Sequence, residues 1–399
     1  LAAVKELRDL GDARAVVPLV GLFDDSSLDV RVTAIAAVGL LKDETAVPAL
    51  LREFKKSIEV VRIAAVTALG NLRDKQALPE LLVQFDRSGS ALRGKIAYSL
   101  AQIATAHPEQ ADSDRALTKL VELLADANLQ SAAKEALLAS GPAAVPRLID
   151  HLEGRIAGHP ATAVELLVLL ADKRATPALI SQLDRGRVPQ TEILSALSEL
   201  GDSRALLPVL ALLDNPDPKV RLQAMQTLGP MLTSKSEASD VIVEHLEDKD
   251  PAIKNLAARY LGQTRSRSAV PGLTKMVNES KSPALRATAL VALGKIGDRE
   301  SLRVALGILE KGPQSLRPIA ADVISELAEE STSPALLRLA VNNKLPYQSL
   351  AVEALGAALR GSTNPEAARA LQQIASGRRL KPALAATEAL AGMKGQSPK

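Results

Sequence analysis

Cysteine and tryptophan are both absent from this sequence of 399 residues, and aromatic residues make up only 2% of it. The absence of cysteine excludes disulfides, thiol nucleophiles and cysteine-based metal sites. With three Phe and three Tyr, the core must consist mainly of small and branched aliphatic side chains, which suit close packing of helix on helix. No run of 18 or more apolar residues occurs, so the sequence predicts no membrane-spanning segment.

An excess of charge of either sign is also missing. Lys and Arg total 49 and Asp and Glu total 46, which leaves a net charge of +3. Proteins that bind nucleic acid or anionic membranes through their overall electrostatic field need a clear excess of cations.

No secretory signal peptide is recognised from Leu1 onward. A cytoplasmic location, and a periplasmic one after removal of a signal peptide, therefore both stay open.

Internal repetition is the feature that the sequence has in abundance. The segment VRVTAIAAVGLLKDETAVPALLREF from Val30 aligns without a gap with VRIAAVTALGNLRDKQALPELLVQF, which begins 31 residues later at Val61. A small residue that follows an apolar one, such as Gly39 or Gly70, recurs mostly in steps of 29 to 33 residues. One unit of this length cannot bury its apolar face alone, so we expect the units to stack.

Two helices, A and B, are predicted in each repeat. Proline recurs where we expect the first turn of the A helix, because no intrahelical hydrogen bond is lost there. This column comprises Pro18, Pro48, Pro79, Pro146, Pro177, Pro208, Pro271 and Pro334. Aspartates that precede it are candidate N-caps: Asp12, Asp43, Asp74, Asp172, Asp202 and Asp298. Apolar residues at helical spacing predict the buried stripe of the B helix over residues 60–72.

Three segments, EVVRIAAVTALGNLRD, DPKVRLQAMQTLGPM and SPALRATALVALGKIGD, resemble the HEAT repeat, most closely the bacterial PBS-lyase HEAT-like type found in phycobilin lyases. The resemblance covers nearly the whole chain. It implies an all-α fold, a right-handed α-solenoid of about 12 helix pairs. We expect one array over residues 1–393 and a polar tail over 394–399. Because Leu1–Asp12 aligns only with the later part of a B helix, the array is expected to begin within a truncated repeat.

The resemblance also implies a structural ladder in which Asp and Arg side chains join neighbouring repeats. The ladder arginines are Arg31, Arg62, Arg93, Arg221, Arg286 and Arg317, with Lys254 as a variant. The aspartates expected to face them are Asp25, Asp86, Asp214 and Asp248. In the central repeats Ser131, Pro160 and Gln190 replace the arginine. Two explanations for these replacements stay open: sequence drift at a position that tolerates change, and a local change in the curvature of the solenoid.

In HEAT arrays the B helices line the concave face, so outward positions one, two and five residues after the arginine form the candidate partner-binding surface. The residues predicted to bind a partner are Ile63, Lys95, Tyr98, Leu222, Gln223, Leu256, Arg259, Ile319 and Leu350. With few cations and several apolar side chains expected to be exposed, this surface favours an extended or helical polypeptide over nucleic acid. The alternative is that the apolar side chains pack between repeats.

Motifs for catalysis are not found: the sequence has no phosphate-binding loop, nucleophile elbow or zinc-protease helix. None of the four histidines forms the His-Glu pair of HEAT-like iron hydroxylases, and a metal site at His151, His159 and Glu153 is a minor alternative to exposed turn residues. The sequence therefore predicts a protein that is not an enzyme, with no catalytic, cofactor or metal residues.

Three functions remain as hypotheses at this point. The first is a protein-binding scaffold or adaptor, with membership of a larger complex left open. The second, suggested by the repeat type, is a phycobilin-lyase-like protein that handles a tetrapyrrole. The third is a nucleic-acid-binding HEAT protein. Short basic runs such as Lys55-Lys56, Arg265–Arg267 and Arg378–Lys381 are interpreted as solvated surface, with docking of an acidic partner as the alternative.

Overall fold

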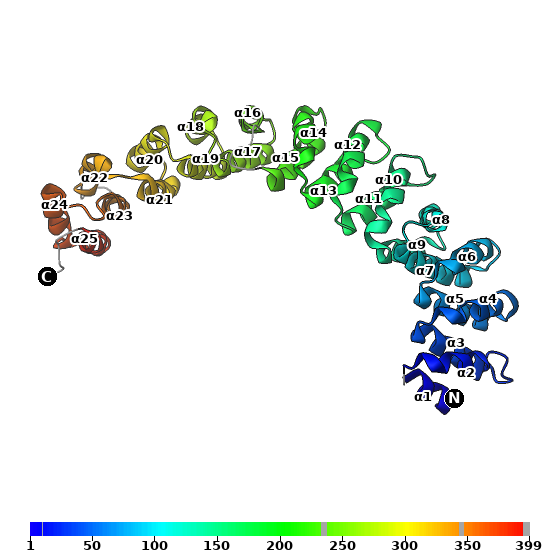
Figure 1. Cartoon of the computed structure of the whole chain (residues 1–399). Coiled ribbons are helices and arrows are strands. Elements are labelled where there is room, and N and C mark those ends of the chain that lie inside the picture. The colour runs from blue at the N-terminus through cyan, green and yellow to red at the C-terminus, as the bar shows by residue number, and fades with distance from the viewer. Residues whose placement is uncertain (10, 233–237, 343–346, 394–399) are drawn as a thin grey trace. The chain divides into compact units, whose positions relative to one another are not determined.

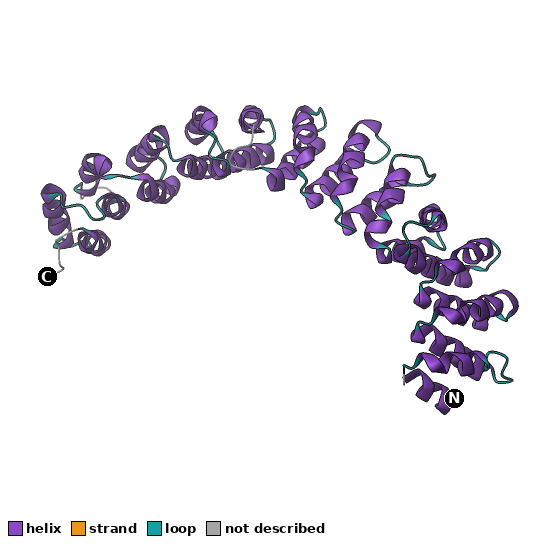
Figure 2. Cartoon of the chain, viewed as in Figure 1, coloured by secondary structure: helices purple, strands orange, loops and turns teal. Residues whose placement is uncertain are grey.

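The structure is a computed structural model that describes residues 1–9, 11–232, 238–342 and 347–393. Throughout these residues the regular elements are helices, and none is a strand (Figure 2). The predicted all-α solenoid fold is confirmed. The predicted polar tail, residues 394–399, lies outside the described residues. The chain divides into two compact units, Leu1–Ala205 and Leu206–Lys399. Continuity of the repeats as a single array stays a prediction.

Unit 1 consists of alternating A and B helices, in which each A helix packs on the B helix that follows it and each B helix packs on the next (Figure 1). The A helices are α2 (Val16–Val20), α4 (Val47–Lys56), α6 (Leu78–Phe85), α8 (Ala111–Glu122), α10 (Val145–Leu152) and α12 (Thr176–Arg185). The B helices are α1 (Ala2–Asp9), α3 (Leu28–Leu41), α5 (Glu59–Leu72), α7 (Ser90–Ala106), α9 (Gln130–Ala139), α11 (Pro160–Leu169) and α13 (Gln190–Leu200).

Unit 2 repeats the same two-layer arrangement. Its A helices are α14 (Leu206–Leu210), α16 (Ala238–Glu244), α18 (Val270–Glu279), α20 (Arg299–Lys311), α22 (Ser333–Ala340) and α24 (Pro365–Ala375). Its B helices are α15 (Pro218–Leu228), α17 (Pro251–Gln263), α19 (Pro283–Ile296), α21 (Arg317–Leu327), α23 (Gln348–Ala358) and α25 (Leu380–Gly392). In the described part of the chain α1 is therefore followed by twelve A–B pairs, which matches the predicted number.

The A helices begin where the predicted proline and aspartate columns indicate. Each proline of the column lies within the first three residues of an A helix. Each candidate aspartate accepts a hydrogen bond from a backbone amide two or three residues later, as Asp43 does from Thr45 (2.9 Å) and Asp298 from Ser301 (2.7 Å). These bonds satisfy amides that have no partner inside the helix, and so they fix where each A helix begins.

Close approach of successive B helices explains the column of small residues. A Cβ atom added to Gly39 on α3 would lie 2.7 Å from the Cα atom of Ala68 on α5. The same distance separates a Cβ added to Gly262 on α17 from Ala292 on α19. The predicted role of this column in helix packing is confirmed, because no side chain fits between the two backbones.

Candidate functional site

The solvent-exposed sides of the B helices form one surface in each unit, which we call the B face. Its residues are counted from the position of the ladder arginine. In α5 residues 62–64 are half-buried, residues 65–66 are buried, and Thr67, the fifth position after Arg62, is exposed. This pattern of burial recurs in α3, α15, α17 and α19, and α21 differs from it only at the exposed Pro318. The fifth position is thus the outermost row of the B face.

Three of the predicted partner-binding residues are exposed as expected: Lys95, Tyr98 and Arg259. The side chain of Tyr98 is a large apolar group that is 46% exposed. The other six are half-buried and correct the expectation that they are exposed: Ile63, Leu222, Gln223, Leu256, Ile319 and Leu350. The neighbouring B helix explains the difference, because successive B helices pack on one another. One contact between them is the 2.9 Å hydrogen bond from Asn255 Nδ2 on α17 to Thr288 Oγ1 on α19.

Other exposed side chains of the B face were not among the residues predicted to bind a partner. Val291, at the fifth position of α19, is 42% exposed, and Leu169, at the ninth position of α11, is 60% exposed. On α9 the exposed fifth position is Glu135, and the adjacent Lys134 forms a 2.6 Å ion pair with Glu165 on α11. The outward residues of α9 were missed because its register was assigned one residue too late. Val291 already occupied an outward position of the sequence pattern but was not selected, and Leu169 lies beyond the three positions considered.

Three of the six ladder arginines bind the C-terminal end of the preceding A helix. The Nε atom of Arg62 donates to the carbonyl oxygen of Phe54 (2.9 Å), that of Arg93 to Phe85 (3.1 Å), and that of Arg286 to Val277 (2.6 Å). These carbonyl groups lie where a helix ends and have no intrahelical donor. The guanidinium groups of Arg62 and Arg93 also lie over the buried Phe54 and Phe85 rings, at 5.5 and 5.7 Å from the centroids.

Within the described residues, the predicted ladder of carboxylates is found at one rung, where Arg221 contacts Asp248 of the next repeat (3.1 Å). Arg31 instead binds the backbone carbonyl of Asp25 (3.1 Å), and Arg93 that of Asp86 (3.0 Å). These two contacts lie within a repeat and use main-chain oxygen, so they correct the expected Asp–Arg pairing. Arg317 lies over the ring of Tyr347, 4.1 Å from the centroid.

Glutamine takes over the arginine's role in repeats that depart from the pattern. The Nε2 atoms of Gln130, Gln190 and Gln348 donate to the carbonyl oxygens at residues 124, 183 and 340, at 2.8 to 3.0 Å. Gln130, rather than the predicted Ser131, therefore occupies the ladder position of α9. In these three repeats a side-chain amide donates to a carbonyl group near the end of the A helix, as the arginines do elsewhere, whereas Pro160 of α11 has no side-chain donor.

The suggested metal cluster is not assembled. His151 is buried, and its two ring nitrogens lie 3.1 and 3.2 Å from the carbonyl oxygens of Ile156 and His159. The His159 side chain is exposed, and Glu153 forms an ion pair with Arg155. Across the residues that the structure describes, no group of three or more His, Asp or Glu side chains is placed to hold a metal ion. The described helices also include none with the length and apolar character needed to span a membrane.

Carboxylates gather on the B face of α21, α23 and α25. Glu353 is exposed, but the pKa of its carboxyl group is raised above the ordinary value because neighbouring atoms partly desolvate the group and because Glu388 and Asp322 lie near it. Glu353 and Asp322 are fifth-position residues, so both belong to the outermost row. Negative charge concentrated here opposes the binding of phosphate groups to this part of the B face.

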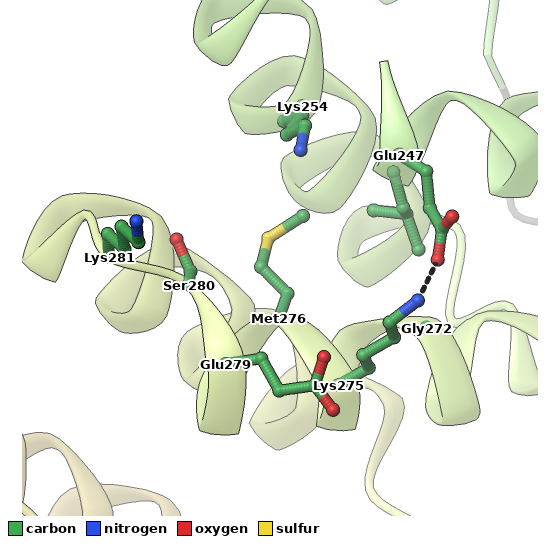
Figure 3. Close-up of a pocket in the computed structure, with 9 residues that line it drawn as sticks. Glu247, Lys254, Gly272, Lys275, Met276, Glu279, Ser280 and Lys281 are labelled. Carbon is green, nitrogen blue, oxygen red and sulfur yellow. Dashed lines mark hydrogen bonds and ion pairs between the residues drawn. The ribbon is translucent and has the colours of Figure 1, made fainter. Parts of the chain in front are cut away.

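A groove of about 350 Å³ lies elsewhere in unit 2, where A helices end and B helices begin (Figure 3). Its lining includes three lysines, Lys254, Lys275 and Lys281, and two glutamates, Glu247 and Glu279. The buried side chains of Leu246 and Met276 also contribute to it.

Comparison with known proteins identifies the repeats. The sequence profile of the HEAT repeats matches residues 54–141, 206–280 and 239–317, which together span just over half of the chain. No curated protein matches. One similar solved structure is an engineered protein from a structural genomics consortium, with 18% identity over 96% of this chain and 99% of that chain and a TM-score of 0.34. Another comes from a study of a phosphorylation switch in the interaction between cadherin and β-catenin, with 14% identity, coverage of 98% and 96%, and a TM-score of 0.34. On the evidence of the profile match, this chain belongs to the HEAT-repeat family.

Proposed function

We propose that this chain is a non-enzymatic scaffold or adaptor that binds another polypeptide through its B face. The observation that carries the proposal is the composition of the outermost row. In unit 1 this row includes the exposed Tyr98 beside Lys95, and in unit 2 it includes Arg259 and Val291. Tyrosine and arginine are the residue types that most often anchor protein interfaces, because each combines a large contact area with a polar end.

The charge of the B face favours a protein over a nucleic acid. Exposed fifth positions include the carboxylates Glu135, Glu165, Asp322 and Glu353. A nucleic-acid groove needs several cations in contact with the phosphates and usually aromatic side chains on which bases stack. The partly buried apolar side chains, such as Leu222 and Leu256, add apolar surface at the seams between B helices that a polypeptide can cover.

Site-directed photocrosslinking tests this function. A crosslinkable residue at Tyr98, on the B face, is compared with one at Val83, which is 51% exposed on the A helix α6. We expect a discrete polypeptide from the source cells to be captured at Tyr98 and not at Val83. The matched variant Lys95→Ala should reduce the yield at Tyr98 because it removes a neighbouring charged contact. Equal capture at both positions, or capture of nucleic acid, would contradict the proposal.

The finer assignment to the bacterial PBS-lyase type rests on the Val-Arg, Ala and Leu-Gly pattern of the repeats and is likewise proposed. It raises the alternative of tetrapyrrole handling. A visible absorption band in the purified protein would favour that alternative over the scaffold, and a spectrum with protein absorbance alone would disfavour it.

A further inference from the structure

Lys254 differs from the ladder residues on either side of it. Arg221 of the preceding repeat binds Asp248 (3.1 Å), and Arg286 of the next repeat binds the carbonyl oxygen of Val277 (2.6 Å). Lys254 occupies the same position of α17 and is half-buried. In the described part of the chain its ammonium group makes no hydrogen bond or ion pair within contact distance, and it interacts with Glu247 only through longer-range attraction.

The ammonium group of Lys254 is directed into the groove between α17 and α18. Figure 3 shows the side chains of Lys254 and Met276 pointing toward one another across it. No hydrogen bond or ion pair occupies this ammonium group in the described residues, so a ligand that supplies a negative oxygen atom can pair with Lys254 across the groove.

The other charged side chains of the groove differ in whether they form an ion pair. Lys275 forms a 2.6 Å ion pair with Glu247 on one wall. Lys281 lies exposed on the opposite rim, beside Ser280, and has no ion pair in the described residues. Glu279 is the other carboxylate of the lining and attracts Lys275. Two ammonium groups of the lining, those of Lys254 and Lys281, therefore form no ion pair in the described residues.

We propose that this groove binds an acidic segment of a partner polypeptide, with an Asp or Glu side chain between Lys254 and Lys281 and an adjacent apolar side chain on Met276 and Leu246. The volume of about 350 Å³ lies at the lower end of the range for ligand pockets. A singly charged carboxylate fits better than a phosphate because Glu247 and Glu279 also face the groove. This surface is separate from the B face and extends the proposed function to a second contact.

Fluorescence anisotropy with the full chain tests this proposal. The probe is a labelled peptide of about ten residues that alternates Glu and Leu, and the comparison peptide has Gln in place of each Glu. We expect the Glu peptide to bind with an affinity that falls between about 50 and about 300 mM salt, and the Gln peptide to bind at least about fivefold more weakly. The double variant Lys254→Gln and Lys281→Gln should lower the affinity for the Glu peptide by a similar factor.

Matched variants separate this groove from other cationic surface. Lys295→Gln removes an exposed ammonium group from α19 on the B face and should leave the affinity unchanged. Lys281→Gln alone changes an exposed residue, so it tests the groove even where the double variant has a lower melting temperature. Equal affinities for the Glu and Gln peptides, or equal losses for Lys281→Gln and Lys295→Gln, would overturn the proposal. Loss of peptide binding in Tyr98→Ala would place the peptide on the B face and would also overturn the groove proposal. If crosslinking at Tyr98 fails while the Glu peptide still binds the groove, the result counts against the B face alone.

Discussion

Arg221 and Asp248 join two successive repeats of unit 2 through a largely buried ion pair. The Nε atom of Arg221 lies 3.1 Å from Oδ2 of Asp248, and the side chains are 17% and 8% exposed. Arg221 also donates to the backbone carbonyl of Asn215 (3.0 Å) at the turn that precedes α15. The guanidinium group thus ties the A–B turn of its own repeat to the turn of the next repeat.

Removal of one partner of this pair should destabilise unit 2. Arg221→Met leaves the Asp248 carboxylate buried without its cation, so we expect the free energy of unfolding to fall by about 3 kcal/mol. Hydrogen exchange of peptides from α15 and α17 measures the loss locally. The double variant with Asp248→Asn should recover part of it, because the unpaired charge is then absent. A single variant that matches the wild type within about 0.5 kcal/mol would contradict the importance of this pair.

Acid should weaken the turn before α14 through Asp202. The hydrogen bond from the Arg204 side chain lowers the pKa of Asp202 well below its ordinary value, although burial opposes this, and the backbone amide of Arg204 and the hydroxyl of Thr176 add to it. Because the folded pKa is depressed, this stabilisation is present above the unfolded pKa of about 3.9 and is lost as the pH falls through the folded value.

Urea titrations between about pH 5 and about pH 2 test this dependence. Asp202→Asn should unfold at a lower urea concentration at pH 5 and show a shallower loss of stability in acid than the wild type. Asp184→Asn, an exposed carboxylate on α12, is the matched control and should retain the wild-type slope. A wild-type slope in Asp202→Asn would contradict the assignment.

Close packing of α17 on α19 predicts opposite effects for two glycine substitutions. Gly262→Ala places a Cβ atom 2.7 Å from the Cα of Ala292, so the helices must separate and we expect a loss of about 1–3 kcal/mol. Gly307 lies inside α20 with nothing within 4 Å of an added Cβ, so Gly307→Ala should gain up to about 1 kcal/mol from helix propensity. Thermal denaturation followed by circular dichroism measures both; a gain at Gly262 would refute the packing argument.

Like charges on the B face should limit stability near neutral pH. Partial desolvation, together with Glu388 and Asp322, raises the pKa of Glu353, so the ionised form is the one that the folded state disfavours. For an acid with a raised folded pKa, stability falls as the pH rises from the unfolded value through the folded one. Glu353→Gln should therefore raise the melting temperature at pH 7 and make a smaller difference at pH 4. Glu366→Gln on α24, an exposed glutamate, is the control, and an equal gain there would argue against local repulsion.

Local chemistry explains how much of the fold was predictable. Proline and aspartate act within a few residues of their own position, so Pro48 and Asp43 indicate where α4 begins without any knowledge of its neighbours. The recurrence of small residues at Gly39 and Gly70 likewise predicted close approach of B helices, because the contact is repeated between equivalent positions. By contrast, Gln130 was not recognised as a ladder residue, since its role depends on a carbonyl group six residues earlier.

The sequence by itself determined the helical pairs, their number and the residues at which the A helices start, because these follow from hydrogen bonds and apolar spacing within one repeat. Tertiary packing decided which side chains are available to a partner. Leu256 and Lys95 both follow a ladder position by two residues, yet Leu256 is half-buried and Lys95 is exposed. That difference depends on the side chains that the next repeat presents. The lack of an ion pair at Lys254 depends on them too, and neither feature follows from the spacing of residues within a single repeat.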